Sequence, residues 1–515
     1  MTTKPRLPDI AVYCALAVAV LIVFGQVASF DFIHYDDPVY VYSNPHVQAG
    51  FTLDSIKWAF TAVVAGNWGP LTLLSHLAVH SLFLMQSGTH HMANVLFHLL
   101  ATLFLYAALE RATGCRLPSA FAAAIFAIHP LHVESVAWVS ERKDVLSALF
   151  WFAGLYTYVR YTEQPGTRRY SIVALLLVLG LISKTMLVTF PFTLLLFDLW
   201  PLRRNLPLSK LITEKLPLFA LIVAGSIAAY LAQAQDKAIS TVTLTLRIEN
   251  ALVSYLTYLR QTLWPANLEW FYLYPTSIPA WQVALAALIL LAITALALYT
   301  WRTRPYIATG WFWYLGTLVP VIGLIQIGAQ SHADRYTYIP MVGLTIIVAW
   351  GALDLIQRWP PLKPVLATAG ALACLACTVL AYNQTSYWEN GKTLFAHSLE
   401  VDPANYWSRY NLALEHYTLG NQYMNSHRRS EAIAEFEDAV RFKPDWAEAD
   451  NNLGTLLATI PGRTGEAIAH FEAALRLDPN LVQAHQNLAL ILAKIPGREA
   501  EAKSHQEAAA RLTPH

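Results

Sequence analysis

The chain has 515 residues, of which 56% are hydrophobic and 13% are charged, and its formal net charge is +1 at pH 7. Its mean hydropathy is +0.39. Soluble domains carry about 25% charged residues, so this composition predicts a membrane protein with several spans. The nearly balanced charge excludes a nucleic-acid-binding protein.

Apolar runs predict about eleven membrane-spanning helices in the part of the chain before residue 383. A helix needs about 20 residues to cross the hydrocarbon layer, and the first run meets that length. The runs lie at 10–29, 91–110, 117–130, 145–161, 170–183, 186–200, 216–233, 279–300, 306–325, 337–355 and 364–382. Arg260 and Gln261 interrupt a further run at 248–264, so that segment is predicted to be re-entrant or to lie at the outer membrane surface.

Lysine and arginine mark the N-terminus and every second loop between the predicted spans. They are Lys4, Arg6, Arg111, Arg116, Arg160, Arg168, Arg169, Arg203, Arg204, Lys210, Lys215, Arg302, Arg304, Arg358 and Lys363. Positive charge is enriched in cytoplasmic loops. The pattern therefore predicts a multi-pass protein of the inner (cytoplasmic) membrane with a cytoplasmic N-terminus. The loop at 30–90 and the C-terminal region are then periplasmic.

Two adjacent carboxylates, Asp36 and Asp37, follow the first predicted span. Aspartate is costly inside hydrocarbon, so the pair is expected at or outside the membrane surface. Short amphipathic helices at 53–60 and 70–84 are predicted to flank this acidic loop. A plainer interpretation is that Asp37-Pro38 only ends the preceding helix and that both acids are solvated.

A metal site in the same loop is a weaker hypothesis. His76 and His80 lie four residues apart, so they share one face of a helix, and histidine is a common metal ligand. Histidines at the level of the lipid headgroups more often only form hydrogen bonds. The sequence requires no cofactor, and no further ligand supports a divalent metal here.

Cationic residues lie at the ends of later apolar runs, on the side predicted to be outside. Arg142 and Lys143 follow the third run, Lys184 lies between the fifth and the sixth, and Arg335 precedes the tenth. Converging cations suit a phosphate or pyrophosphate head group. Each of them alone is explained by anchoring a helix end at the membrane surface. Their common side favours one shared polar cavity.

After Tyr382 the sequence becomes charged, rich in alanine and repetitive. Residues 431–436 (EAIAEF) recur at 466–471 (EAIAHF), a step of 35 residues. The same step separates Pro444, Pro479 and Pro514. Tetratricopeptide repeats have a step of about 34 residues. Residues 384–515 are therefore predicted to form a tetratricopeptide-repeat α-solenoid whose concave face suits an extended peptide, and residues 1–383 form the membrane domain.

Several motifs together resemble the transmembrane and tetratricopeptide-repeat protein O-mannosyltransferases. They are residues 36–37 (DD), 67–72 (NWGPLT), 91–98 (HMANVLFH), 126–138 with 141–144 (ERKD), 184–189 (KTMLVT) and 333–340 (ADRYTYIP). The resemblance covers nearly the whole chain, and the combination is more specific than any single motif. It implies an all-α, GT-C-like membrane fold and a polyprenyl-phosphate sugar donor used outside the cytoplasm.

The resemblance also implies roles for individual residues. Asp36 and Asp37 fall on the family's acidic pair, and either is a candidate for the catalytic base. The candidates to bind the donor phosphate are Lys184 and Arg335, which fall on the family's outer cations, together with Arg142 and Lys143. Further candidates for the substrate pocket are His34, Trp68, His91, Asn94, His129, His132, Glu134 and Asp334.

Two positions depart from the pattern of the relatives. Thr185 stands where bacterial relatives often have proline, and Gly69 stands where they often have histidine. The missing histidine removes a ligand or proton carrier next to the acidic loop. This departure weakens the metal hypothesis further.

Together these features predict an enzyme that moves a sugar to an extracytoplasmic acceptor, with Ser or Thr hydroxyls of proteins as the favoured acceptor. The sugar is mannose in the eukaryotic relatives. A carboxylate would take the proton of the hydroxyl, and cations would stabilise the leaving lipid phosphate. A single carboxylate implies direct displacement with inversion, since a double displacement needs a second, nucleophilic carboxylate.

Two other classes of protein compete with this prediction. A non-catalytic, membrane-anchored repeat scaffold for protein assembly is the main alternative, but such a scaffold needs only one or two spans. A transporter would place its charged residues near the membrane midplane, whereas here they lie at the ends of the apolar runs.

Overall fold

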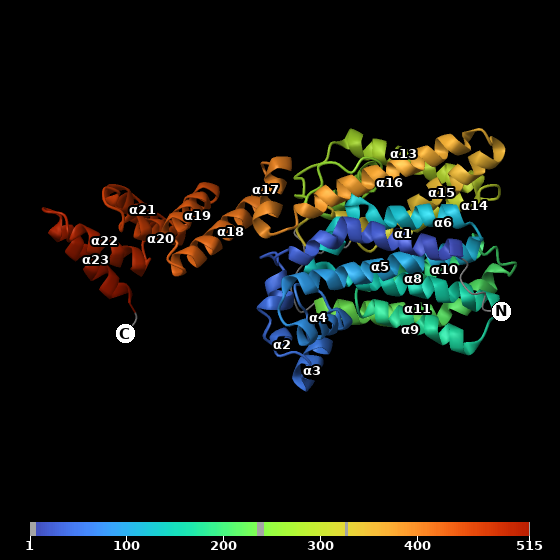
Figure 1. The fold of residues 1–515 in the computed structure, drawn as a ribbon, viewed down its shortest axis with the longest axis horizontal. Coiled ribbons are helices and arrows are strands. Elements are labelled where there is room, and N and C mark those ends of the chain that lie inside the picture. The colour runs from blue at the N-terminus through green and yellow to red at the C-terminus, as the bar shows by residue number, and fades with distance from the viewer. Residues whose placement is uncertain (1–6, 234–241, 325–327, 514–515) are drawn as a thin grey trace. The chain divides into compact units, whose positions relative to one another are not determined.

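The computed structural model describes residues 7–233, 242–324 and 328–513 (Figure 1). Within these ranges the chain forms α-helices and short 3-10 or π-helical turns, and no extended strand occurs. The predicted all-α class is confirmed. The chain divides into two compact units, residues 1–390 and 391–515.

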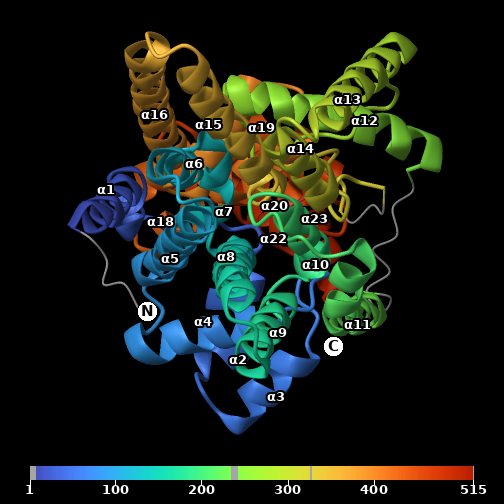
Figure 2. The same cartoon turned by 90° about the vertical axis from the view of Figure 1, so that its right-hand side faces the viewer.

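Long helices of the first unit run side by side, as Figure 1 shows for α1, α5, α8 and α9. Figure 2 looks along the same helices and shows α8 surrounded by neighbours. The helices of this bundle are α1 (Leu7–Phe24), α5 (Ser87–Thr113), α6 (Arg116–Ile128), α8 (Arg142–Glu163), α9 (Thr167–Leu181), α10 (Phe190–Leu199), α11 (Leu208–Gln233), α12 (Leu244–Leu263), α13 (Ala280–Thr300), α14 (Pro305–Leu318), α15 (Met341–Arg358) and α16 (Leu362–Ser386).

Two glycines allow α14 and α15 to approach closely. A Cβ atom on Gly310 would lie 2.3 Å from the Gly343 carbonyl oxygen, and one on Gly343 would lie 2.2 Å from the Gly310 carbonyl oxygen. Any side chain at either position would therefore separate the helices. Small residues serve the same purpose at other helix interfaces in membranes.

Six helical segments in the described ranges are long and apolar enough to cross a membrane. They are Ile10–Ser29, Ser87–Thr113, Leu208–Ala228, Ala280–Thr300, Met341–Arg358 and Leu362–Ser386, and the bent pair Arg116–Ile128 and Pro130–Ala137 makes up to seven. The multi-pass class is thus confirmed. The other predicted spans coincide with α8, α9, α10 and α14, which are shorter or more polar, so the count of eleven stays a prediction.

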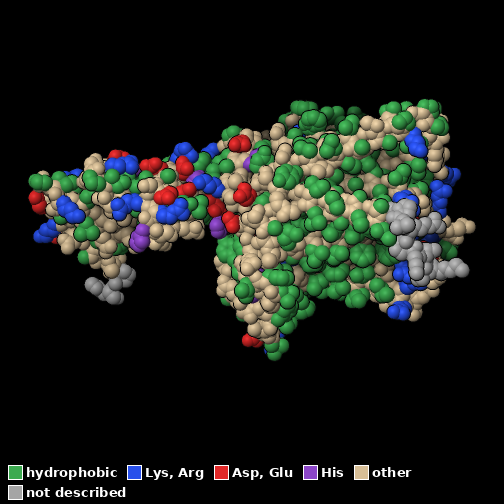
Figure 3. Space-filling view, viewed as in Figure 1, with side chains coloured by type: hydrophobic (Ala, Val, Ile, Leu, Met, Phe, Trp, Pro, Cys, Tyr) green, Lys and Arg blue, Asp and Glu red, His purple; other side chains and the backbone are tan. Residues whose placement is uncertain are grey.

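The surface of the first unit suits a lipid environment. Hydrophobic side chains cover much of its face in Figure 3. On α13, the side chains of Leu288 and Leu291 are 65% and 68% exposed, as expected for residues that contact lipid rather than protein. Lysine and arginine gather at the end of the unit where α1 begins, and the assignment of that end to the cytoplasm stays a prediction.

Short helices form the predicted acidic loop between α1 and α5. They are η2 (Pro38–Tyr42), α2 (Pro45–Gln48), α3 (Leu53–Thr61) and α4 (Pro70–Phe83), whereas η1 (Gly25–Ser29) completes the first apolar segment. The Thr52 side chain accepts a hydrogen bond from the Ser55 backbone N–H (3.0 Å) and so caps α3. Leu53 and Leu82 are 68% and 74% exposed, as expected for helices at a membrane surface.

The second unit consists of α17 (Gly391–Val401), α18 (Tyr406–Asn425), α19 (Arg429–Phe442), α20 (Ala447–Leu457), α21 (Thr464–Leu477), α22 (Val482–Leu492) and α23 (Glu499–Leu512). The starts of α19, α21 and α23 are 35 residues apart (464 − 429 and 499 − 464), as are those of α20 and α22 (482 − 447). Phe436 and Phe471 are buried at equivalent positions. The structure therefore contains a helical repeat with the predicted step, while its assignment as tetratricopeptide repeats stays a prediction.

Candidate active site

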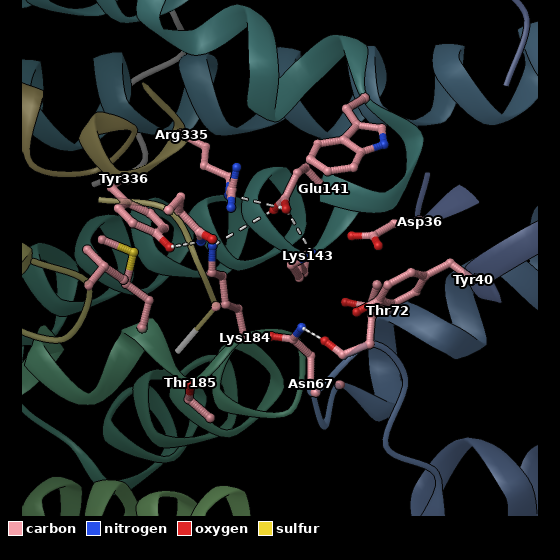
Figure 4. A pocket seen from close by; sticks show the side chains of 18 of the residues that line it. Asp36, Tyr40, Asn67, Thr72, Glu141, Lys143, Lys184, Thr185, Arg335 and Tyr336 are labelled. Carbon is pink, nitrogen blue, oxygen red and sulfur yellow. Dashed lines mark hydrogen bonds and ion pairs between the residues drawn. The ribbon is translucent and has the colours of Figure 1, made fainter. Parts of the chain in front are cut away.

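A cavity of about 450 Å³ lies in the first unit, and segments far apart in the sequence form its wall (Figure 4). Its wall includes Tyr35, Asp36, Tyr40, Asn67, Trp68, Gly69, Thr72, Trp138, Glu141, Lys143, Ser183, Lys184, Thr185, Trp270, Phe271, Gln330, Ser331, Arg335 and Tyr336. Five of the residues predicted from the sequence meet here: Asp36, Trp68, Lys143, Lys184 and Arg335. The predicted shared polar cavity therefore exists.

Glu141 lies at the centre of the three cations of the cavity wall. Its Oε1 atom is 3.0 Å from Lys143 Nζ and 3.3 Å from Arg335 Nε, and its Oε2 atom is 4.0 Å from Lys184 Nζ. Burial favours the neutral acid, but the positive charges of these neighbours hold the pKa of Glu141 below its ordinary value. Glu141 is therefore ionised at neutral pH.

Two further carboxylates hold the cations from outside the cavity wall. Glu134 pairs with the Arg335 guanidinium and accepts a hydrogen bond from the Arg335 backbone N–H (2.9 Å). Asp144 pairs with Lys184 and accepts a hydrogen bond from Ser135 Oγ (3.1 Å). We call Glu134, Glu141, Lys143, Asp144, Lys184 and Arg335 the cavity cluster. Its cations have fixed positions before any ligand binds, which is the arrangement needed to stabilise developing negative charge.

Asp36 and Asp37 lie in different environments. Asp37 is fully buried and accepts hydrogen bonds from the Ile33 backbone N–H (2.8 Å), the Ser140 backbone N–H (3.0 Å) and the Ser140 hydroxyl. It joins the acidic loop to the segment before α8 and is not part of the described cavity wall. Asp36 lines the cavity, so of the two acids that the sequence left open as the base it is the better candidate.

Burial raises the pKa of Asp36, while Lys143 and Arg335 act in the opposite direction and Glu141 adds to the rise. A raised pKa makes the ionised carboxylate a stronger proton acceptor. Asp36 and Glu141 thus differ in chemistry although both line the cavity. Asp36 suits proton transfer, whereas Glu141 suits ion pairing.

Arg142, Asn94 and His91 fix the polypeptide behind the cavity. Arg142 is fully buried and donates hydrogen bonds to Asn94 Oδ1 (2.9 Å) and the His90 carbonyl oxygen (2.7 Å). Asn94 Nδ2 donates to the Trp138 carbonyl oxygen (2.8 Å). A ring nitrogen of His91 lies 2.7 Å from the Ala137 carbonyl oxygen.

The prediction that Arg142 binds the donor phosphate therefore needs correction. Arg142, Asn94 and His91 lie outside the described cavity wall. They hold residues 137–142, the segment that carries Trp138 and Glu141 to that wall. Their effect on the cavity is indirect.

Other predicted pocket residues also make contacts away from the described cavity wall. The His129 and His132 rings bind the carbonyl oxygens of Thr262 (3.1 Å) and Phe126 (2.7 Å). Asp334 accepts a hydrogen bond from the Tyr272 hydroxyl (2.9 Å). The His34 ring packs against Tyr42, and Glu134 reaches the site only through Arg335. These predicted residues surround the site and do not line it.

The predicted metal ligands lie elsewhere in the acidic loop. His76 is buried with its ring 5.9 Å from that of His90, and His80 Nε2 is 3.0 Å from the Gln48 carbonyl oxygen. In the described residues, no group of three or more His, Cys, Asp or Glu side chains could hold a metal ion. The metal hypothesis therefore remains a prediction without structural support.

Gly69 has a packing role in this chain. A Cβ atom there would lie 2.9 Å from the Ser183 carbonyl oxygen, so a larger residue would push α4 away. Next to it, Thr72 Oγ1 donates a hydrogen bond to the same Ser183 oxygen (3.1 Å). The start of α4 thus packs directly on the turn that presents Lys184.

Sequence analysis gave Glu141 no role beyond the 141–144 motif, and of the aromatic residues in the cavity wall it singled out only Trp68. The Tyr35 ring packs 4.9 Å from Trp270 and 6.2 Å from Trp138, and the Arg335 guanidinium lies 5.8 Å from the Trp138 ring. Aromatic walls exclude water and strengthen the electrostatic interactions inside. Glu141 adjoins two predicted cations, and that position was an available signal.

These observations define a class: a multi-pass helical membrane protein whose cavity combines one candidate base with three preorganised cations. Comparison with known proteins then shows what the chain is similar to. The model of the family described as "Dolichyl-phosphate-mannose-protein mannosyltransferase" matches residues 71–230. That region contains Glu141, Lys143 and Lys184.

The human protein O-mannosyl-transferase TMTC1 is 25% identical over 516 aligned residues, which cover 86% of this chain and 56% of the human protein. The human protein O-mannosyl-transferase TMTC3 is 24% identical over 75% of this chain and 46% of its own length. The chain thus spans about half the length of these curated relatives. The chain is thus similar to the transmembrane and tetratricopeptide-repeat O-mannosyltransferases, and the predicted resemblance is confirmed.

Among solved structures, the chain is similar to ArnT from Cupriavidus metallidurans, whose crystal structure contains undecaprenyl phosphate. The sequence identity is 13%, and the match covers 93% of this chain and 81% of ArnT with a TM-score of 0.40. A TM-score of 0.40 is too low to assign a shared fold.

Proposed function

We propose that the chain is a membrane glycosyltransferase that moves a sugar from a polyprenyl-phosphate donor to a protein hydroxyl outside the cytoplasm. The observation that carries this proposal is the cavity that joins Asp36 to Lys143, Lys184 and Arg335. The names of the relatives favour mannose as the sugar, a lipid phosphate such as dolichyl phosphate as its carrier, and protein as the acceptor.

Asp36 acts as the general base in the proposed reaction. The acceptor hydroxyl oxygen bonds to the anomeric carbon of the sugar while the bond from that carbon to the phosphate oxygen breaks. The hydroxyl proton passes to Asp36. The lipid phosphate leaves with the bonding electron pair, and the three cations stabilise its negative charge.

Direct displacement by this route inverts the anomeric configuration. A retaining mechanism would need a second carboxylate as nucleophile. Glu141 is the other carboxylate of the described cavity wall, and contacts with three cations lower its nucleophilicity. The environment of Glu141 therefore favours the inverting mechanism.

The second unit, in this proposal, is a tetratricopeptide-repeat solenoid that holds the acceptor protein on the periplasmic side of the inner membrane. The 35-residue helical repeat supports the solenoid, and the alternation of positive loops supports the topology. Deletion of residues 404–515 should then abolish transfer to protein but spare slow hydrolysis of the donor by water. A truncated enzyme that still modifies its protein acceptor normally would rule out this division of labour.

The full-length protein, reconstituted in lipid, tests the activity directly. A labelled polyprenyl-phosphate mannose and a Ser/Thr-rich periplasmic protein are supplied together, and transfer is followed by intact mass. We expect an O-linked sugar whose anomeric configuration is opposite to that of the donor. Periplasmic proteins from cells that lack the gene serve as unmodified acceptors, and the proposal is contradicted if the enzyme transfers no sugar to them. Retention of the anomeric configuration would contradict the proposed mechanism.

A further inference from the structure

Glu141 is a buried carboxylate of the cavity wall that keeps unused hydrogen-bonding capacity. The residue is 2% exposed and lies in the cavity wall. Its Oε1 atom contacts Lys143 and Arg335, whereas its Oε2 atom lies 4.0 Å from Lys184 Nζ and accepts no hydrogen bond from the described residues. A buried acceptor that stays unsatisfied is costly, so its position calls for a functional explanation.

The carboxylate takes up the cations that a phosphate would need. Figure 4 shows the contacts from Glu141 to Arg335, Lys143 and Lys184 converging at one point of the cavity. A bound phosphate and the Glu141 carboxylate therefore compete for the same positive charges. Glu134 and Asp144 also pair with Arg335 and Lys184, but they do so from outside the described cavity wall.

Charge distinguishes the product of the proposed reaction from its donor. The sugar donor is a phosphodiester with one negative charge. The lipid phosphate left after transfer is a monoester that carries nearly two negative charges above about pH 6. Three cations without a competing anion would hold this product more tightly than the donor, and release of the product would then limit turnover.

We propose that Glu141 is a resident competing anion that selects against the dianionic lipid phosphate and so speeds release of the product. This inference rests on the proposed function. Glu141 forms and breaks no covalent bond in the reaction, and the proton of the acceptor still passes to Asp36. As the phosphate leaves, the Glu141 carboxylate resumes its contacts with Lys143 and Arg335.

Direct binding to the full-length protein in detergent tests the inference without any need for turnover. The two probes are a short-chain polyprenyl phosphate and its methyl diester, measured at about pH 8, where the monoester is dianionic. We expect the wild type to bind both probes with similar affinity. Glu141→Gln removes the charge at nearly constant size, and its affinity for the monoester should rise about tenfold or more relative to the diester.

Two further variants distinguish the effect of the negative charge of Glu141 from the effect of its position. Glu141→Asp keeps the negative charge, so its monoester-to-diester ratio should stay near that of the wild type. Glu141→Ala provides a second neutral variant if Glu141→Gln does not fold. In transfer assays the neutral variants should show stronger inhibition by added lipid phosphate than the wild type does.

The possible outcomes distinguish this inference from the proposed function. Equal weakening of both probes in the neutral variants would show that Glu141 only positions the cations, and it would overturn the inference. A wild type that already prefers the monoester by tenfold would overturn it as well. A wild type that binds neither probe would overturn the proposed function, and the inference would fail with it.

Discussion

Two ionic clusters lie along α8, and only one of them is built as a site. The cavity cluster includes Lys143 and Asp144 in the first turn of this helix. The second, which we call the closed cluster, consists of Tyr158, Asp198, Arg204, Glu214 and Lys215. From Lys143 to Tyr158 is 15 residues (158 − 143) of helix, which is about 22 Å at 1.5 Å per residue.

Pairing is complete in the closed cluster. Arg204 donates two hydrogen bonds of 2.8 Å to the two Glu214 oxygens, and Lys215 Nζ lies 2.5 Å from Asp198 Oδ2. The Tyr158 hydroxyl donates to Asp198 Oδ1 (2.6 Å). Two cations and two carboxylates balance one another, and none of these residues lines the described cavity.

The cavity cluster has three cations and three carboxylates, so its charge is balanced as well. What differs is the open volume beside it, the additional carboxylate of Asp36 and the unsatisfied Glu141 oxygen. A buried ionic network is therefore no sign of a site by itself, since such networks also fix helices in place. Open volume and an oxygen that accepts no hydrogen bond distinguish the cavity cluster as the candidate site.

The largest expected effect comes from Asp36→Asn, which removes the candidate base from the cavity. Asparagine keeps the size but cannot take the proton, so kcat should fall by about a hundredfold to ten-thousandfold. The thermal unfolding temperature should not change. Radiolabel transfer and a melting curve on the same preparation measure the two quantities.

Asp37→Asn is the matched control because it makes the same change one residue away. Asparagine presents an N–H group where Asp37 accepts three hydrogen bonds, so the variant should lose about 1–3 kcal/mol of stability. Its folded fraction should remain active. Wild-type activity in both variants would rule out a catalytic role for the acidic pair.

The sequence predicted several residues of the cavity cluster for a physical reason. Lys143, Lys184 and Arg335 each adjoin an apolar run, and a charged residue there must lie near the membrane surface. Their common side followed from the parity of the predicted spans. Helix ends on the same side of the membrane are neighbours in space, so charged residues at these ends can meet although they lie far apart in the sequence.

The sequence could not distinguish neighbours within a motif. Asp36 lines the cavity and Asp37 does not, and the same is true of Lys143 and Arg142. Which of two adjacent side chains faces the cavity depends on long-range contacts, such as the hydrogen bonds from Ser140 to an aspartate 103 residues away. Such pairings are absent from local sequence patterns.

The sequence analysis also did not predict the closed cluster. Arg204 and Lys215 entered the topology argument as ordinary loop cations. In the structure they are buried or mostly buried and pair with Asp198 and Glu214. The partners were visible in the sequence, but nothing in a one-dimensional pattern shows that they meet.

Arg335→Ala tests whether the cavity cluster, unlike the closed cluster, binds the donor. The variant removes a guanidinium held against Glu141 and Glu134, so a phosphate loses a charged hydrogen-bonding partner. We expect kcat/KM for the donor to fall by about tenfold to a hundredfold, with a higher KM and a lower kcat. Steady-state kinetics with varied donor measure both. A change in stability with unchanged kinetics would place Arg335 in the same category as the closed cluster.

Lys215→Met tests the closed cluster with the opposite expectation. The substitution leaves Asp198 buried without its ammonium partner, which should cost about 3–5 kcal/mol of stability. The kcat of the folded enzyme should stay within about twofold of the wild type, because the closed cluster is far from the cavity along α8. Denaturant unfolding in detergent measures the first quantity and transfer kinetics the second. A large loss of kcat at wild-type stability would show that the closed cluster takes part in function.

The smallest expected effect concerns the acid limb of the pH–rate profile. Burial raises the pKa of Asp36, and only the ionised carboxylate accepts the proton, so kcat/KM should fall with decreasing pH at a midpoint above the usual aspartate value of about 4. Lys143 lowers this pKa and Glu141 raises it. Lys143→Met should therefore move the midpoint to higher pH, and Glu141→Gln should move it to lower pH. Profiles of kcat/KM for the wild type and both variants measure these shifts, and midpoints that coincide in all three would mean that the titrating group is not Asp36.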